Sequence, residues 1–374
     1  MNVLDLFCGC GGMSWGLHQT GFTILCGIDN DAIALKTFKR NHPDAIALHD
    51  NLALLSPEAC LSKMNLLPDK IDCIIGGPPC QGFSKNVPRS QRFLDDNRNL
   101  LVRRFLEFVK VIRPTLVLME NVAEIVNAFD GAFTNEILSE LRILGYDCDV
   151  KILDAVDYGI PQHRKRAFFF GSLSKKVEFP YPTHFPNDKI LPLFVNNTMN
   201  YISVWDAIGD LPSLTDKEGT DSYNQQPVTP YQKQMRQNIH RLHNHVARPL
   251  TPKQLERLSS LAPGEGAKML PEQLRPKSYY SGAYGRLTKD MVARTLTRWL
   301  FHPGSGRYGH PVDIRTITIR EAARLQSFSD DFIFEGSFTQ ASSQIGNSVP
   351  PLFMRAFAPI MQNHLKNIML NVGQ

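Results

Sequence analysis

Long hydrophobic runs and cysteines at C-x-x-C spacing are missing from this 374-residue chain, and we expect no signal sequence. Its longest apolar stretches, such as Leu116–Met119 and Ala167–Phe170, fall far short of the roughly 20 residues of a membrane helix. The seven cysteines include no C-x-x-C spacing, which argues against a disulfide framework and against a zinc ribbon. The first residues have no basic start followed by an apolar stretch. We therefore expect a cytoplasmic protein with reduced cysteines and no metal.

The whole chain has a formal net charge of +5, and the net positive charge comes from one part of it. Residues 172–314 contain 18 Lys and Arg against 12 Asp and Glu, and the remainder is close to neutral. Six of the eleven histidines lie in the same segment. A basic segment beside a neutral remainder indicates a surface for a polyanion, with a solvated basic face as the alternative.

Short apolar stretches alternate with amphipathic segments over the first 171 residues. This alternation predicts an α/β domain, in which a parallel sheet is covered on both faces. The predicted strands are Val3–Phe7, Thr23–Ile28, Ala45–Leu48, Ile71–Ile75, Leu116–Met119 and a closing pair, Tyr146–Leu153 and Arg166–Phe170. The predicted helices are Met13–Gln19, Asp31–Asn41, Leu100–Ile112 and Asn135–Leu144.

Residues 172–314 differ in composition, because proline, glycine and asparagine are frequent and periodicity is weak. This break and the chain length predict a second, less regular domain. After it, Thr318 and Glu321 have the spacing of a capping box at a helix start. Helical spacing returns in Gln344–Leu370, which we expect to rejoin the first domain.

A glycine-rich turn follows the first predicted strand, in the run DLFCGCGG that begins at Asp5. Glycines between a strand and a helix let a ligand approach the backbone and the helix N-terminus. No Gly-Lys-Ser/Thr follows, so the turn is not a phosphate P-loop. The second strand ends at Asp29, where a carboxylate can hold a ribose diol. The pattern favours a nucleoside cofactor, either a nicotinamide or an S-adenosyl compound.

A cysteine and an acid follow two other predicted strands. Cys80 lies in the run GGPPCQGFS, on a rigid turn after two prolines, and Glu120 lies in MENV at the end of the fifth strand. Because the carboxyl ends of parallel strands meet at one edge of a sheet, we expect Glu120 near Cys80. A thiol nucleophile beside a carboxylic acid can attack an electron-poor ring and polarise it.

With these motifs in order, the chain resembles the DNA (cytosine-5) methyltransferase family of the bacterial restriction-modification type. The resemblance rests on DLFCGCGG, Asp29, GGPPCQGFS, MENV, QHRKRAFFFG, RTITIREAARLQSF and QIGNSVPPL. It implies a Rossmann-like, S-adenosylmethionine-dependent methyltransferase domain of residues 1–185 and 335–374. It also implies a smaller inserted target-recognition domain, which binds DNA, of residues 186–334.

The resemblance also implies roles for individual residues. Cys80 would add to carbon-6 of a cytosine, and Glu120 would hold ring nitrogen 3 and the exocyclic amine. Asn121 would position the neighbouring loop, and Arg164 and Arg166 would support the site. The residues that match positions around S-adenosylmethionine are Phe7, Gly9, Gly11, Asp29, Asn30, Asp50, Pro79, Leu100, Asn347 and Ser348. The residues expected to contact DNA from the polar stretch after Cys80 are Gln81, Ser84, Lys85 and Arg98.

The activity implied is methyl transfer to carbon-5 of a flipped-out cytosine in a specific double-stranded DNA sequence, through a covalent Cys80 adduct. Such methylation would protect the DNA from a cognate restriction endonuclease, and we expect a monomer. An RNA cytosine-5 methyltransferase and a non-catalytic DNA-binding protein are the alternatives. The large basic segment favours DNA, and the presence of both Cys80 and Glu120 argues against a non-catalytic protein. A nucleophilic cysteine also argues against a methyltransferase of adenine or of the cytosine amine.

For the remaining residues of interest, the sequence predicts structural or surface roles. The remaining six cysteines are expected to pack in the interior, and Ala322, Leu325 and Phe328 to pack around the capped helix. His240, His243 and His245 lack the acid or cysteine partners of a metal site. The arginines that are candidates for guanine or phosphate contact are Arg236, Arg241, Arg248, Arg275, Arg286 and Arg298.

Overall fold

A computed structural model describes residues 1–79, 100–186, 199–237 and 239–372, with side chains to residue 366. The chain forms two compact units. The first contains Met1–Asp154, Lys165–Pro182 and Val349–Gln374, and the second contains Ala155–Arg164 and Thr183–Ser348. The chain therefore passes between the units four times, and neither unit is a single continuous segment. The functional division into catalytic and target-recognition domains stays a prediction.

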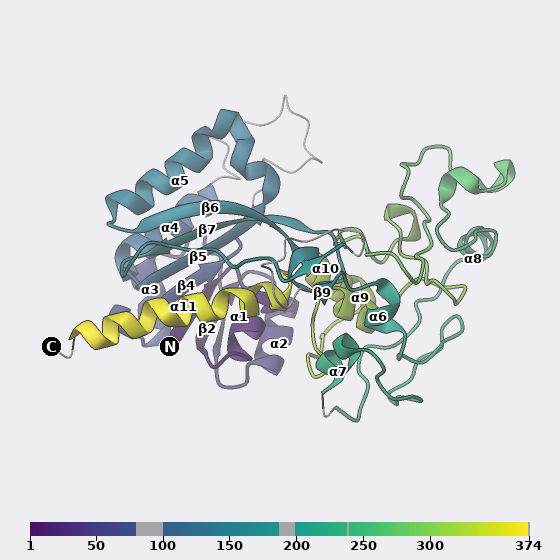
Figure 1. The fold of residues 1–374 in the computed structure, drawn as a ribbon, viewed down its shortest axis with the longest axis horizontal. Helices are drawn as coiled ribbons and strands as arrows, with labels where there is room; N and C mark the ends of the chain where they lie inside the picture. Colours follow the sequence, from purple (N-terminus) through teal and green to yellow (C-terminus); the bar gives the residue numbers. More distant parts are fainter. Residues whose placement is uncertain (80–99, 187–198, 238, 373–374) are drawn as a thin grey trace. The chain divides into compact units, whose positions relative to one another are not determined.

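The first unit is built on a seven-stranded sheet (Figure 1). In sheet order its strands are β3 (Ile46–His49), β2 (Thr23–Asp29), β1 (Asn2–Leu6), β4 (Cys73–Gly76), β5 (Leu116–Val122), β7 (Lys165–Ser172) and β6 (Asp147–Asp154). Strands β1 to β5 pair in parallel, whereas β7 is antiparallel to both β5 and β6. The predicted α/β fold is confirmed, and the expected closing pair of strands forms its antiparallel edge.

Helices cover both faces of this sheet. They are α1 (Gly12–His18), α2 (Ala32–Asn41), α3 (Pro57–Met64), α4 (Leu100–Ile112), α5 (Ala132–Ile143) and α11 (Pro351–Val372). Three of them, α3, α4 and α5, pack in one apolar core with the strands. On strand β7, Phe169 belongs to that core, while Phe168 and Phe170 contact Phe357 of α11. This is the two-residue alternation of a strand buried on both faces.

The second unit contains short helices joined by long irregular segments. Its helices are α6 (Val204–Ile208), α7 (Pro230–Arg236), α8 (Pro252–Ser259), α9 (Ile319–Leu325) and α10 (Phe338–Asn347), and its short strands are β8 (His184–Phe185) and β9 (Met199–Asn200). The 3-10 helices of the described chain are Pro68–Lys70, Ala123–Gly131, Ala155–Tyr158, Ala267–Met269, Glu272–Leu274 and Pro303–Ser305. The predicted helix over Gln344–Leu370 is two helices, because the chain turns at Ser348 before Pro350 and Pro351.

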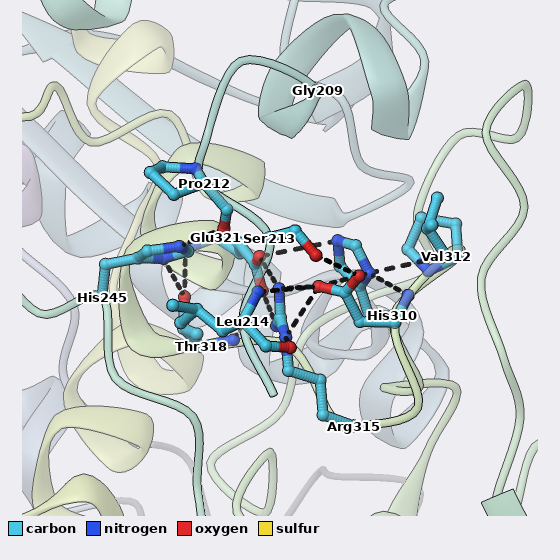
Figure 2. A network of polar contacts seen from close by, with 12 residues as sticks. Gly209, Pro212, Ser213, Leu214, His245, His310, Val312, Arg315, Thr318 and Glu321 are labelled. Atoms are coloured by element: carbon cyan, nitrogen blue, oxygen red, sulfur yellow. Dashed lines mark hydrogen bonds and ion pairs between the residues drawn. The ribbon is translucent and has the colours of Figure 1, made fainter. Parts of the chain in front are cut away.

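Helix α9 is buried along its whole length, including its charged residues. Its capping box of Thr318 and Glu321 is confirmed. Figure 2 shows how Glu321 also accepts two hydrogen bonds from Arg315, both of 2.8 Å, and how the His245 ring joins Thr318 to the Pro212 carbonyl. Burial alone would raise the pKa of Glu321, but Arg315, together with His310 and His245, outweighs this effect and the pKa is lowered.

The two arginines within α9, Arg320 and Arg324, bind backbone carbonyls of other segments. Arg320 donates to the carbonyls of His243, Ser329 and Phe332. Arg324 donates to the Ala207 carbonyl and forms ion pairs with two buried aspartates, Asp210 and Asp330. Buried carbonyls outside helices and sheets need hydrogen-bond donors, and a guanidinium supplies five of them. In the first unit, the strand ladder supplies hydrogen bonds to backbone carbonyls. In the second unit, the arginines supply part of these hydrogen bonds.

Candidate active site

Four strands of the first unit end at one edge of the sheet. Leu6 lies opposite Ile28 on one side and Gly76 on the other, and Gly76 lies opposite Met119. The residues that follow in each strand or turn are Phe7, Asp29, Gly77 and Glu120. The parallel register therefore brings the glycine turn, the ribose-type acid, the Pro-Pro turn and the predicted catalytic acid to the same edge, as expected of this fold.

The glycine turn begins with Phe7, which has a left-handed backbone at φ 59°. The turn is held by hydrogen bonds from Cys8 N–H to the Ile28 carbonyl and from Gly11 N–H to the Cys8 carbonyl. Gly9 also has positive φ, and a Cβ placed there would meet no atom of the other described residues within 4 Å, apart from its chain neighbours. The surface at Gly9 is therefore open, so a ligand can approach the main chain at this point.

Asp29 closes the turn from the second strand. Its carboxylate accepts hydrogen bonds from the N–H groups of Gly9 (2.8 Å) and Asp31 (2.9 Å). Burial raises the pKa of Asp29, and these hydrogen bonds oppose the rise. Each carboxylate oxygen has a further lone pair, so Asp29 can also accept hydrogen bonds from ligand hydroxyls.

Two more cofactor candidates follow strands β2 and β3. The Asn30 carbonyl contacts the His49 ring at 3.0 Å, and Asp50 N–H donates to the Asp29 carbonyl at 3.1 Å. The Asp50 carboxylate pairs with Lys63, whose hydrogen bond lowers the pKa of Asp50. The turns after β2 and β3 are thus joined to each other beside the glycine turn.

Asp5, to which the sequence motifs assigned no role, lies in the strand just before the glycine turn. Asp5 is only 1% exposed, and one carboxylate oxygen accepts a 2.6 Å hydrogen bond from the Ser14 hydroxyl. Its other oxygen is buried and has no hydrogen-bond partner among the described residues. Burial raises the pKa of Asp5 to about 7. An acid inside an otherwise apolar strand was the sequence signal that could have marked this residue.

Glu120 is held at the end of β5 by a strand neighbour. Its carboxylate forms a 2.9 Å ion pair with Arg166 Nε of β7, and both side chains are mostly buried. A Cβ at Gly77 would come within 3.1 Å of the second Glu120 oxygen. The side chain of the next residue, Asn121, donates to the Pro78 carbonyl at 3.0 Å. The Gly77–Pro79 turn is therefore fixed against Glu120 and Asn121 on the chain immediately before Cys80.

The remaining predicted site residues fall into three places. Leu100 begins α4 and is 40% exposed, and Pro79 ends the described part of its turn. Arg164, Asn347 and Ser348 belong to the second unit, and Arg164 binds backbone carbonyls of Leu296, Gly346 and Ser348 there. The predicted residues that lie outside the described residues are Cys80, Gln81, Ser84, Lys85 and Arg98.

The other six cysteines are all buried, which confirms the expectation that they pack in the interior. Burial raises the pKa of each thiol, so the thiolate is disfavoured at neutral pH. These cysteines are Cys8, Cys10, Cys26, Cys60, Cys73 and Cys148. None of these six has the setting of a nucleophile.

The candidate DNA-contacting arginines of the second unit differ in exposure. Arg286 is 5% exposed and donates to the carbonyls of Leu261, His310 and Val312, so its guanidinium is used within the unit. Arg298 is exposed, with its guanidinium 4.7 Å from the ring centre of Trp299. Among the described residues, no group of three or more His, Cys, Asp or Glu is arranged for a metal ion, and no helix is long and apolar enough to cross a membrane.

Comparison with known proteins gives consistent relatives over nearly the whole chain. The family model described as C-5 cytosine-specific DNA methylase matches residues 1–363. The Type II methyltransferase M.AgeI of Thalassovita gelatinovora is 32% identical, covering 96% of this chain and 98% of that protein. The Type II methyltransferase M1.HphI of Haemophilus parahaemolyticus is 34% identical, covering 96% of this chain and 86% of that protein.

Solved structures agree with this fold. An E. coli prophage protein described as a DNA modification methyltransferase has a TM-score of 0.75 and 28% identity, covering 98% of this chain and 99% of its own. The Entamoeba histolytica methyltransferase EhMeth has a TM-score of 0.62 over 98% of both chains. At 16% identity, the latter shows the shared fold alone.

Proposed function

Since this chain belongs to the C-5 cytosine-specific DNA methylase family, we propose that it transfers a methyl group from S-adenosylmethionine to carbon-5 of a cytosine within a specific double-stranded DNA sequence. The observation that carries the proposal is the sheet edge, where Glu120, the Gly77–Pro79 turn and the glycine turn share one register. The Type II names of its relatives support a role in a restriction-modification system, where methylation protects DNA from a cognate endonuclease.

The residues at the glycine turn suit S-adenosylmethionine. The open main chain at Gly9 gives the ligand access, and Asp29 can accept hydrogen bonds from ribose hydroxyls. The unpartnered oxygen of Asp5 can accept one from an ammonium group or a water. Bound there, the cofactor supplies an electrophilic methyl group. The other residues proposed to line it are Phe7, Gly11, Asn30, Asp50, Pro79, Leu100, Asn347 and Ser348.

Cys80 is the proposed nucleophile. Its thiolate forms a bond to carbon-6 of the cytosine, and the ring electrons displaced by this addition make carbon-5 nucleophilic. Glu120 accepts a hydrogen bond from the exocyclic amine, and a proton held between its carboxyl group and ring nitrogen 3 offsets the negative charge that develops on that nitrogen. The ion pair with Arg166 keeps the Glu120 carboxylate in one orientation. After carbon-5 is methylated, water accepts the proton of carbon-5. The electrons of that C–H bond re-form the double bond between carbon-5 and carbon-6, and the bond to the Cys80 sulfur breaks to release the thiolate.

These atoms of the cytosine are inaccessible inside a duplex, so the base must be flipped out at a cost of a few kcal/mol. The chain directly after Cys80 is polar, and we assign the phosphate and base contacts there to Gln81, Ser84, Lys85 and Arg98. Asn121 fixes the turn before the nucleophile through the Pro78 carbonyl. We also propose that Arg164 supports the site. We expect the working protein to be a cytoplasmic monomer.

Expression of the wild type and Cys80→Ser in a host without cytosine methylation tests this proposal. Bisulfite sequencing of host DNA should find protected cytosines in one short motif with the wild type and none with Cys80→Ser. Cys148→Ser is the matched control, because this buried thiol on β6 donates to the Leu138 carbonyl far along the chain from the turn, and it should retain methylation. Folded wild type that binds S-adenosylmethionine and leaves all cytosines convertible would contradict the proposal.

A further inference from the structure

Gln162 is a fully buried polar side chain in the second unit, with 0% exposure. Its Oε1 accepts a 2.9 Å hydrogen bond from Leu296 N–H. Its Nε2 donates to the Leu325 carbonyl at 3.1 Å and to Gln326 Oε1 at 2.6 Å. The amide orientation follows from the partners, because an N–H only donates and a carbonyl only accepts. Gln162 thus connects the end of α9 with Leu296, which lies 134 residues after Gln162 in the chain.

Gln162 binds the N–H group of Leu296, and Arg164 binds the carbonyl group of Leu296. Arg164 Nη1 donates to this carbonyl at 3.1 Å. Beside these contacts, His163 N–H donates to the Ala293 carbonyl at 2.9 Å and Ala293 N–H donates to the Pro161 carbonyl at 3.1 Å. Residues 161–164 and 293–296 therefore run together as a short parallel pairing, with both backbone groups of Leu296 held by side chains.

The same side chains reach the end of α10. Arg164 Nη2 donates to the Ser348 carbonyl at 3.1 Å, and Gln326 Nε2 donates to that carbonyl at 2.7 Å. Gly346 is in direct backbone contact with the clamped segment, since a Cβ there would lie 2.2 Å from Arg298 N. We call Gln162, Arg164 and Gln326 the buried clamp.

The clamp holds a segment whose other side chains face outward. Ala293 and Leu296 are buried, whereas Arg294, Arg298 and Trp299 are exposed, the last by 46%. The Arg298 guanidinium lies over the Trp299 ring. An exposed guanidinium beside an aromatic ring suits phosphates and base edges. Gln162 and Arg164 hold the main chain of Leu296, and this main chain in turn fixes the position of Arg298, two residues later.

From this arrangement, we infer that Gln162 is a positioning residue for target recognition: through Leu296 it fixes the exposed Arg298–Trp299 pair, which contacts the DNA duplex. The inference rests on the proposed function. Gln162 itself contacts neither DNA nor cofactor in this role. Loss of the Gln162 hydrogen bonds alone leaves Arg164 and its hydrogen bonds to Gly346 and Ser348 in place. It should therefore weaken DNA binding while the chemistry and the cofactor affinity stay close to those of the wild type.

Gln162→Met removes the hydrogen bonds and keeps the size of the side chain. We expect the KM for a duplex with the recognition sequence to rise about tenfold. The kcat should stay within about threefold and the Kd of S-adenosylmethionine within about twofold. Tyr231→Phe is the matched control, because it removes one buried hydrogen bond to the Arg324 carbonyl in the same unit without touching Leu296. Its KM for DNA should stay within about twofold.

A double-mutant cycle with Arg298→Ala separates positioning from simple stability. Arg298→Ala alone should raise the KM for DNA, and adding Gln162→Met should then raise it by less than about twofold, since both act through one contact. Penalties that multiply fully in the double variant would overturn the inference, as would an unchanged KM in Arg298→Ala, an exposed site where folding is not at stake. Wild type that methylates no DNA would instead overturn the proposed function.

Discussion

Asp5 is a carboxylic acid in a place where a charge is costly. It lies in strand β1, inside the sheet and nearly without solvent contact, and one of its oxygens accepts a hydrogen bond from the Ser14 hydroxyl. Desolvation by burial is the main reason why its pKa is raised to about 7, and the nearby Asp29 adds to the rise. The folded protein therefore binds a proton at Asp5 more tightly than the unfolded chain does.

The stability contributed by this proton depends on pH in a defined direction. It is fully present below the unfolded pKa of about 4 and is lost as pH rises through about 7. Urea unfolding at pH 5 and pH 8 should show the wild type losing a few kcal/mol over this interval. Asp5→Asn, which cannot ionise, should lose less. Equal losses in the two proteins would contradict a raised pKa in the folded state.

At the scale of elements, α9 shows how a short helix organises an irregular unit. Seven consecutive residues are buried, and Arg315, Arg320 and Arg324 send their guanidiniums to main-chain carbonyls and buried acids. Glu321 is both the acid of the capping box and the partner of Arg315. Breaking such a buried pair leaves an uncompensated charge in the interior.

Glu321→Ala should therefore lower the free energy of unfolding by about 3–5 kcal/mol, because Arg315 loses its bidentate partner and the helix loses half of its cap. Glu256→Ala on the exposed face of α8 is the matched control and should change stability by less than about 0.5 kcal/mol. Thermal or urea unfolding measures both variants. A Glu321→Ala protein as stable as the control would show that the pair contributes little.

Local patterns predicted the first unit well and the second poorly. The helix Leu100–Ile112 has its predicted bounds because apolar periodicity determines it locally. The buried arginines of α9 were not predicted, because a charged residue is usually exposed and their partners lie far away, 117 residues in the case of Arg324 and Ala207. At the site, strand register supports the expected place of Glu120 beside the Pro-Pro turn, whereas the position of Cys80 itself stays a prediction.

At the scale of the whole molecule, the net positive charge comes from residues 172–314, most of which lie in the second unit. Cations that neutralise phosphates release counterions, so DNA affinity should fall steeply with salt. If the protein contacts about six phosphates, the logarithm of the association constant should fall with the logarithm of the salt concentration with a slope of about −5. The association constant should then fall about 10³-fold between about 50 and 200 mM salt.

Fluorescence anisotropy with a labelled duplex over this salt range measures the slope. Binding of S-adenosylmethionine to the same preparation is the internal control and should change by less than about twofold, because it involves no phosphate backbone. A DNA affinity that is flat with salt would contradict an electrostatic role for the basic segment.

The buried arginines of the second unit have one more consequence. Arg320 and Arg164 bind mostly main-chain carbonyls, which every amino acid provides. The side chains of the contacted loops can therefore change in evolution without loss of these hydrogen bonds. The fold of the unit therefore depends little on which residues occupy its outward-facing positions. This independence lets a lineage acquire a new target sequence by exchanging surface residues alone.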